Sequence, residues 1–366
     1  MARGDLLPSE SRSFADQATG AHVRQVTDRP SIHHHPFYYI PCFDDNMEFL
    51  FFVSHRTGRP EIFAEIRSSG DLLQMSEVEN LGEWSVHPSH DGKHVYFVAG
   101  TRACRLSTQS LELEVLADFG DVSMREKGMV GAAMGTTTLS RDDRFWAVPV
   151  KVGDRSLFHL IETGTGKVEV FLESETIGHP QFHPEDTTLM RYAGPYHSRI
   201  WVTRTDGSEN RLVYQRDVEK KEWIVHETWL PGTMEILTTR WPHGMFAIDV
   251  ESGAMRPVCS FNAWHPMINR EGNLMVADTN FPDRGLQLFD PLDGRGEPKQ
   301  LCETLATNEG AHWNTDHCPY DDGPVQVYAP QHTHPHPNFS PDGKRVVFAS
   351  DRTGYAQVYE VELPTA

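Results

Sequence analysis

The sequence predicts an all-β fold, a seven-bladed β-propeller formed by residues 1–366 as a single domain. Three observations lead to this prediction. A unit of turn, alternating apolar strand, second turn and second strand recurs along the chain. Its copies lie about 40 to 50 residues apart, the length of a four-stranded blade. No stretch shows a competing apolar period of 3.6 residues, so helices are not expected to form the core.

The clearest copy of the unit begins at Phe339 and reads FSPDGKRVVFASDRTGYAQVYEVEL. Weaker copies begin near Phe43, Ser89, Ser140, His183, Leu230 and Asn269. Asp-Gly turns between strands also occur in β-sandwiches and barrels, which are the alternative folds. Seven copies at a nearly constant spacing favour the propeller.

Two segments depart from the even spacing. The last interval, from Asn269 to Phe339, is about 70 residues long, which exceeds one blade. We therefore expect the sixth blade to carry an insertion at about 278–329. Residues from 1 to about 20 precede the first copy and are expected to form a short N-terminal extension.

Composition limits the classes of function. The net charge of −19 argues against binding to nucleic acid or to an anionic membrane, because both require clustered Lys and Arg. No apolar run approaches 18 residues and no secretory leader is evident, so we expect a cytoplasmic protein. The 5 cysteines lack a CxxC pair and are expected to be reduced thiols. An anionic substrate would need a local positive site, for example a metal with one or two arginines.

The run from Gln331 to His336 is the strongest candidate for a metal site. In an extended segment alternate side chains share a face, so His334 and His336 can converge on one ion. Pro335 and Pro337 disfavour a helix and stiffen the segment. A polar loop that happens to be rich in histidine is the alternative, since the chain contains 20 histidines.

Further histidines precede the turns of several repeats. Equivalent positions of successive blades lie at the same end of a propeller, so we expect these histidines to gather around one mouth of the central channel. Any one of them could instead be a structural, hydrogen-bonded histidine. The set is His34, His35, His87, His179, His226, His265, His334 and His336.

Five segments give the chain a resemblance to a known family. IHHHPFYY, SRIWVTRTDGS, HETWLPGT, WHPMINREGNLMVAD and QHTHPHPNFSPDG, in this order, resemble bacterial oligogalacturonate lyases, which are seven-bladed propeller enzymes of pectin breakdown. The similarity runs from about residue 15 to the C-terminus. It implies a divalent metal, typically manganese, held by His265, Gln331, His334 and His336. It also implies His226 as the catalytic base and Arg199 as the arginine that binds substrate.

The resemblance implies a reaction as well. Short α-1,4-linked galacturonides, such as digalacturonate or unsaturated digalacturonate, would be cleaved by β-elimination to unsaturated uronates. A metal and Arg199 would neutralise the carboxylate next to C5, and His226 would accept the C5 proton. We expect substrate contacts from His34, His35, His197, Arg240 and His243, with His197 or Tyr196 as a candidate proton donor.

Three alternatives remain open at this stage. The first is a lyase of another uronide, such as a rhamnogalacturonan or glucuronan fragment, decided by the sixth-blade insertion and the loop around Trp241. The second is a non-catalytic propeller that serves as a binding module. The third and weakest is a metal hydrolase, because no pair of carboxylates or activated nucleophile stands out among the histidines. The segments PYDDGPVQVYAPQ and RWPHGMF depart from the family pattern and leave the exact uronide open.

Overall fold

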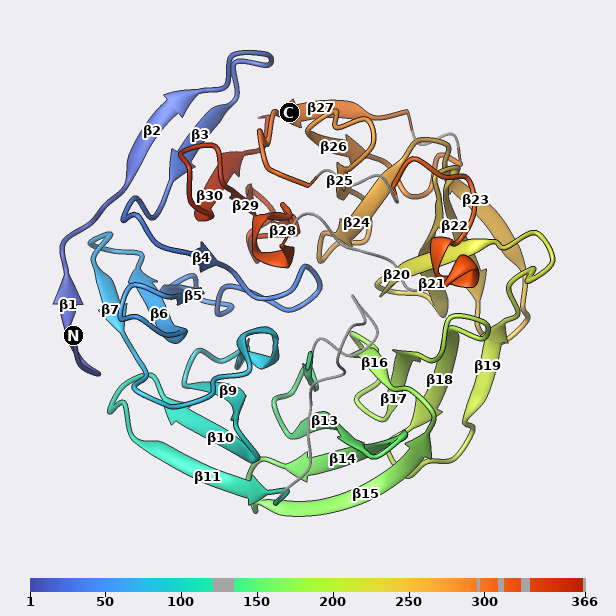
Figure 1. Cartoon of the computed structure of the whole chain (residues 1–366), viewed down its shortest axis with the longest axis horizontal. Helices are drawn as coiled ribbons and strands as arrows, with labels where there is room; N and C mark the ends of the chain where they lie inside the picture. The colour runs from blue at the N-terminus through green and yellow to red at the C-terminus, as the bar shows by residue number, and fades with distance from the viewer. Residues whose placement is uncertain (121–134, 295–296, 309–312, 324–329, 365–366) are drawn as a thin grey trace.

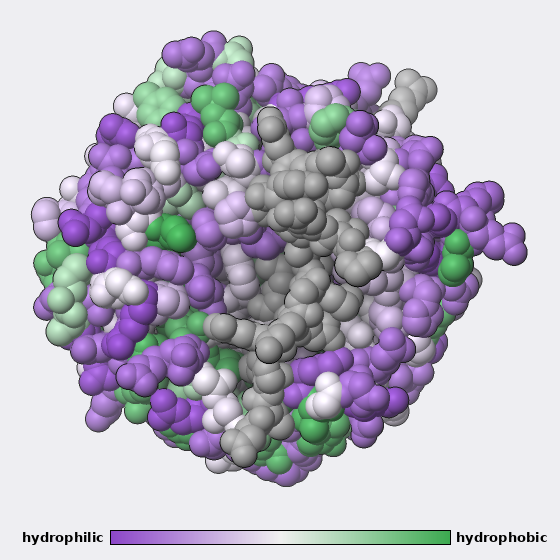
Figure 2. Space-filling model, viewed as in Figure 1, coloured by the Kyte–Doolittle hydropathy of each residue, from purple (hydrophilic) through white to green (hydrophobic). Residues whose placement is uncertain are grey.

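The computed structural model is a ring of seven β-sheets around a central channel, as predicted (Figure 1). It describes residues 1–120, 135–294, 297–308, 313–323 and 330–364. The helices in these ranges are short 3₁₀ turns, namely η1 (Glu83–Ser85), η3 (Pro319–Asp322) and η4 (Gln331–Thr333). None of the described helices has the length and apolar character needed to cross a membrane. Hydrophilic residues dominate the rim of the face in Figure 2, as the high net charge requires.

The first three blades follow the chain, each with its innermost strand listed first. Blade one contains β4 (His33–His34), β5 (Phe49–Ser54), β6 (Glu61–Ile66), β7 (Leu72–Gln74) and β1 (Leu6–Leu7). Blade two contains β8 (His87–Pro88), β9 (His94–Ala99), β10 (Arg102–Ser107) and β11 (Leu113–Asp118). Blade three contains β12 (Thr138–Leu139), β13 (Phe145–Val152), β14 (Arg155–Glu162) and β15 (Lys167–Ser174).

The next three blades have the same order from the channel outward. Blade four contains β16 (Gly178–Phe182), β17 (Leu189–Ala193), β18 (Ile200–Arg204) and β19 (Arg211–Tyr214). Blade five contains β20 (Trp223–Trp229), β21 (Glu235–Trp241), β22 (Gly244–Asp249) and β23 (Met255–Cys259). Blade six contains β24 (Ala263–Ile268), β25 (Met275–Thr279), β26 (Leu286–Phe289) and β27 (Lys299–Cys302).

Blade seven closes the ring with strands from both ends of the chain. It contains β28 (Asn338–Phe339), β29 (Arg345–Ser350), β30 (Gln357–Glu362), β3 (His22–Gln25) and β2 (Arg12–Ala15). Val23 of β3 pairs with Val361 of β30. The expected N-terminal extension thus contributes β1 to blade one and β2 to blade seven. Residues 278–302, expected within the insertion, include β26 and β27, and the long connection to β28 begins only after Cys302.

The core lies between neighbouring blades. Branched and aromatic side chains of one sheet pack on those of the next, which is the environment that favours such residues in strands. Between blades six and seven, for example, Val276 and Leu286 join Val346, Phe348 and Val361 in one buried cluster.

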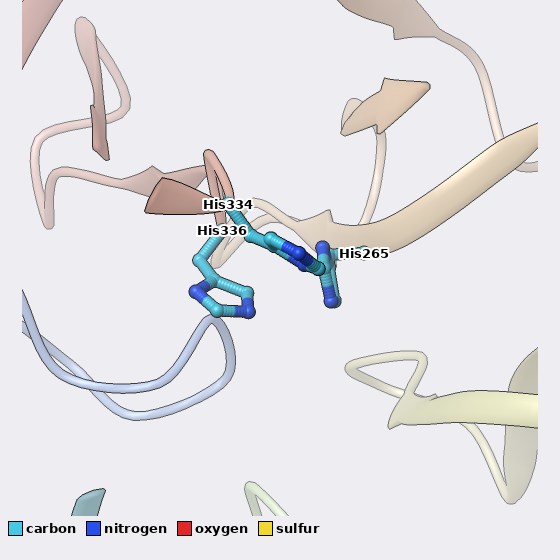
Figure 3. Close-up of side chains that lie close together, drawn as sticks. All are labelled: His265, His334 and His336. Carbon is cyan, nitrogen blue, oxygen red and sulfur yellow. The ribbon is translucent and has the colours of Figure 1, made fainter. Parts of the chain in front are cut away.

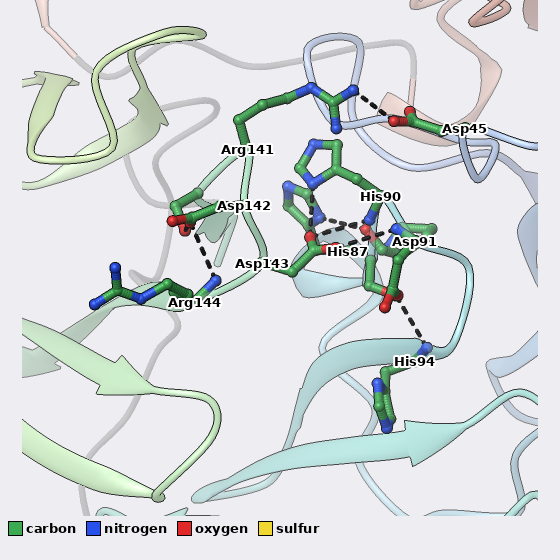
Figure 4. A network of polar contacts seen from close by, with 12 residues as sticks. Asp45, His87, His90, Asp91, His94, Arg141, Asp142, Asp143 and Arg144 are labelled. Atoms are coloured by element: carbon green, nitrogen blue, oxygen red, sulfur yellow. Dashed lines mark hydrogen bonds and ion pairs between the residues drawn. The ribbon is translucent and has the colours of Figure 1, made fainter.

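The repeated turns connect blades at one end of the ring. In blade two, the Ser89 hydroxyl donates to Asp91 and closes the turn at 2.8 Å. Figure 4 shows how this turn joins the equivalent turn of blade three: His90 Nδ1 lies 2.6 Å from Asp143 Oδ1, and the Asp91 amide donates to the same carboxylate. The polar residues of the repeat therefore link successive sheets.

Counting back from these turns separates two rings of residues around the channel. Positions two and four residues before the turn both border the channel, at different depths. The residues two before the turn line a cavity near the turns: Cys42, His87, Thr138, Gln181, Thr228, Met267 and Asn338. The residues four before the turn lie toward the opposite mouth in blades four to seven: His179, His226, His265 and His336.

Blade one has no histidine at the equivalent position, and a loop of this blade lies in the channel. Residues 37–40, which follow β4, form a buried aromatic cluster at the centre of the ring (Figure 1). Phe37 contacts the rings of His179, His265 and His336, which come from three different blades. The Tyr38 hydroxyl donates to the Glu227 carbonyl at 3.1 Å. This loop, which we call the channel plug, separates the cavity near the turns from the histidine mouth.

Candidate metal centre and active site

β-Bulges place the histidines of the innermost strands. The pairing of β16 with β17, β20 with β21 and β24 with β25 shifts by one residue next to His179, His226 and His265, respectively. His179, His226 and His336 have positive φ values of 45°, 51° and 46°. For residues other than glycine, such a conformation costs about 1–3 kcal/mol each and persists where the surroundings enforce it. The strain therefore marks the histidine mouth as a functional site.

Three imidazoles converge at this mouth. His265 comes from β24, while His334 and His336 come from the segment before β28 (Figure 3). One nitrogen of each ring lies within 4.8 Å of the corresponding nitrogens of the others, and all three residues are buried. The His265 and His336 ring centroids are 4.2 Å apart. The arrangement can hold a divalent cation that accepts nitrogen ligands.

A carboxylate orients the first of these rings. Asp278 Oδ2 lies 2.8 Å from His265 Nδ1, and Asp278 Oδ1 accepts the His265 amide at 2.7 Å. Because the carboxylate accepts the Nδ1 proton, Nε2 of His265 keeps its lone pair for an ion. His336 Nε2 is buried and has no hydrogen-bond partner among the described residues. Both features fit a metal ligand.

Arg199 is held beside the histidines by a buried carboxylate. Its Nε donates to Glu227 Oε1 at 2.5 Å, and its Nη2 lies 3.2 Å from His179 Nδ1. Arg191 also contacts Glu227, so two guanidinium groups share one carboxylate. Both Arg199 and Glu227 are buried, so this is not a surface ion pair. The excess positive charge makes this side of the site attractive to an anion.

His226 lies between Arg199 and the three imidazoles. Its ring centroid is 4.4 Å from that of His265, and its edge packs on Trp264. Burial lowers the pKa of His226 well below its ordinary value, and the charges of His265 and His179 act in the same direction. Its Nδ1 has no hydrogen-bond partner among the described residues. A neutral ring with an unused nitrogen can accept a proton.

A small cavity connects these groups. No carboxylate occurs among its described lining residues, and Arg199 provides a fixed positive charge. Gln331, at the start of η4, lines it near the imidazoles and is only half-buried. The aromatic lining includes Trp223 and Trp264, whose indole N–H groups have no hydrogen-bond partner among the described residues. The cavity can therefore bind an anionic ligand with apolar faces, such as a uronic acid.

Tyr196, a candidate proton donor, lines this cavity, whereas the other residues predicted to contact the substrate lie outside the lining. His35 Nε2 lies 3.2 Å from the carbonyl oxygen of Pro335, so His35 contacts the backbone between His334 and His336. His34 lies against Glu83 and His55. His197, Arg240 and His243 are exposed. His87 belongs to the ring two residues before the turn, so the expectation that it joins the histidine mouth is wrong.

Sequence reasoning missed the residues that position the site. Glu227 and Asp278 are single acidic residues within apolar strands, and nothing in their local sequence names their partners. One signal was available for the histidines themselves, namely the distance to the turn. Counting four residues back from each turn selects His179, His226, His265 and His336 and excludes His87.

Comparison with known proteins identifies the family of the chain. The family model described as oligogalacturonate lyase matches residues 154–366. An oligogalacturonide lyase of Pectobacterium atrosepticum is 25% identical and an oligogalacturonate lyase of Dickeya dadantii 24% identical, each across 100% of this chain and 99% of the relative.

Solved structures show the same fold. An oligogalacturonate lyase in complex with manganese has a TM-score of 0.81 at 22% identity, with 100% of this chain and 99% of that chain covered. An oligogalacturonate lyase from Vibrio parahaemolyticus has a TM-score of 0.80 at 20% identity, with 99% of both chains covered. The chain therefore belongs to the oligogalacturonate lyase family and is a lyase that acts on oligogalacturonides.

Proposed function

We propose that the protein cleaves short α-1,4-linked galacturonides, with digalacturonate as the model substrate, by a metal-dependent β-elimination at the histidine mouth. The observation that carries the proposal is that Arg199 and His226 line one cavity together with His265, which converges with His334 and His336. A cytoplasmic location stays a prediction.

The residues proposed to hold the metal are His265, Gln331, His334 and His336. Their nitrogen and oxygen donors suit manganese and its neighbours in the first transition row, and no thiolate joins them. The fit is supported by the Asp278 contact to His265 and by the buried, unpartnered Nε2 of His336. A divalent cation bound there supplies a Lewis acid that draws electron density from the substrate carboxylate.

The remaining steps belong to the side chains. The Arg199 guanidinium, fixed through Nε by Glu227, binds the uronate carboxylate by charge and hydrogen bonding. His226, neutral at neutral pH, accepts the C5 proton through its unused Nδ1. The bond from C4 to the leaving oxygen then breaks, a double bond forms between C4 and C5, and the leaving oxygen takes a proton from water or from Tyr196, which lines the cavity. Trp223 and Trp264 present apolar faces and N–H groups to the sugar.

The test combines activity with metal content. Manganese-loaded protein mixed with digalacturonate should produce the ultraviolet absorbance of an unsaturated uronate. His226→Ala should lower turnover by about 10²- to 10⁴-fold, the usual worth of a general base, and should keep its metal. His336→Ala should lose metal and activity together.

Two outcomes would overturn the assignment. Wild-type turnover in His226→Ala would exclude this residue as the base. Equal metal content in the wild type and in His336→Ala would exclude the proposed ligand set. A rhamnogalacturonan fragment serves as the control substrate, and faster cleavage of it than of digalacturonate would assign the enzyme to another uronide.

A further inference from the structure

A second group of metal-binding side chains lies near the histidine mouth, at the junction of blades one and two. It consists of His34 in β4, His55 directly after β5, and Glu83 in η1. One ligand atom of each residue lies within 4.8 Å of the other two. The ring of Trp84 packs between this group and the first site, with centroids 4.4 Å from His34 and 5.6 Å from His336.

The hydrogen bonds of His34 define which nitrogen is available. Its Nδ1 lies 3.1 Å from the carbonyl oxygen of His35, which can only accept, so Nδ1 carries the proton. In a neutral ring, Nε2 then presents a lone pair. That atom lies 3.1 Å from Glu83 Oε2, which is itself an acceptor when ionised. Two acceptors at this distance need a proton or a cation between them, and a cation would satisfy both atoms.

His55 contacts the same carboxylate oxygen of Glu83 as His34 does. His55 Nε2 lies 2.6 Å from Glu83 Oε2, so two imidazole nitrogens converge on one carboxylate. Ligands of a tetrahedral ion with bonds of about 2.0–2.1 Å are about 3.3 Å apart, so a small opening of the group would admit the ion. His34 is buried, whereas the side chains of His55 and Glu83 are 26% and 27% exposed, which leaves a path for entry.

We propose that His34, His55 and Glu83 form a second divalent-cation site, with a two-histidine, one-carboxylate ligand set that also occurs in zinc enzymes. Its backbone support matches that of known metal sites, in which the ligating histidine donates its other N–H to a carbonyl or carboxylate. The helix η4, which contains His332, packs against β4, the strand that contains His34. An ion at this site would join β4 and β5 of blade one to η1 and so stabilise the junction of two blades.

The experiment counts ions in metal-free protein that has been equilibrated with Zn²⁺ and desalted. The wild type should retain two zinc ions per chain, Glu83→Gln one, His336→Ala one, and the double variant none. His55→Ala, a change at a half-exposed position, gives a second test should Glu83→Gln fold poorly. His90→Ala is the matched control, since it breaks a similar histidine–carboxylate pair far from both sites and should retain two ions.

The results separate the two sites. The second site would be overturned if the wild type, Glu83→Gln and His55→Ala all retained two zinc ions. It would also be overturned by a wild type with a single ion that His336→Ala removes. A single ion that Glu83→Gln removes and His336→Ala keeps would support the second site and reject the first. Crystals soaked in Zn²⁺ should show anomalous density between His34, His55 and Glu83.

Discussion

At the scale of single residues, Arg199 depends on geometry as much as on charge. Its Nε is engaged by Glu227 and its Nη2 by His179, so the planar group is fixed in two directions. A lysine has one nitrogen and cannot make both contacts while it reaches a substrate carboxylate. The environment of Arg199 therefore specifies a guanidinium.

We expect Arg199→Lys to lower kcat/KM on digalacturonate by roughly 10²-fold, since a misplaced charge loses orientation. Metal content and the unfolding midpoint should stay near those of the wild type. Arg204→Lys is the matched control, because Arg204 ends the strand that begins after Arg199 and forms a partly exposed pair with Asp186 outside the cavity lining. Equal kinetics for the two variants would remove Arg199 from the site.

Asp278 acts on the metal site through His265. Asp278→Asn should lower manganese affinity by roughly 10- to 100-fold, the usual effect of losing a carboxylate that orients a ligating histidine. Titration of metal-free protein with Mn²⁺ measures the change. Asp249→Asn, in an exposed turn, should bind the metal as the wild type does. Unchanged affinity in Asp278→Asn would show that His265 does not bind the ion through Nε2.

At the scale of elements, the hairpin between β25 and β26 depends on a glycine. Gly285 has φ +70°, and a Cβ there would lie 2.1 Å from the Cys302 carbonyl oxygen of β27. Gly253 has the same φ of +70°, yet no atom lies within 4 Å of its Cβ position. An alanine at position 253 therefore measures backbone strain alone, whereas an alanine at position 285 adds a steric clash.

Gly253→Ala should destabilise the protein by about 1 kcal/mol, the cost of a left-handed alanine. Gly285→Ala should cost about 2–4 kcal/mol in total, because β27 must move away from β26. Urea denaturation measures both free energies of unfolding. Equal losses would mean that β27 adapts without cost.

The elements that the sequence predicted are those with local signals. The turns at Ser89, Ser140 and Ser340 identify the strands around them because Ser, Asp and Gly close such turns within a few residues. β1 and β2 escaped prediction because their partners, β7 and β3, give no local signal of the pairing. The bulges at His179, His226 and His265 were also hidden, because a one-residue register shift depends on the neighbouring strand.

At the scale of the whole molecule, folding buries several histidines in the neutral form. Burial lowers the pKa of His33 to about 3, of His35 to about 4 and of His87 to about 3. In the unfolded chain the pKa of each histidine would be about 6.5. The unfolded state thus binds more protons below that pH, and stability falls as pH decreases.

We expect the metal-free protein to lose about 2 kcal/mol of stability per such histidine between pH 7 and pH 5. His87→Gln cannot take up this proton, so its free energy of unfolding should fall by about 2 kcal/mol less over the same range. Urea titrations at the two pH values measure the difference. Parallel curves for the wild type and the variant would show that His87 binds its proton as readily in the folded state as in the unfolded state.

Among the described residues, the channel plug lies between the histidine mouth and the cavity near the turns. We therefore expect that a galacturonide does not pass through the ring and that it reaches the histidines by one end of its chain. Both products would then leave through the opening by which the substrate entered. A bound fragment would exclude the next substrate molecule, so we expect the products to inhibit cleavage competitively and terminal linkages to be cleaved in preference to internal ones.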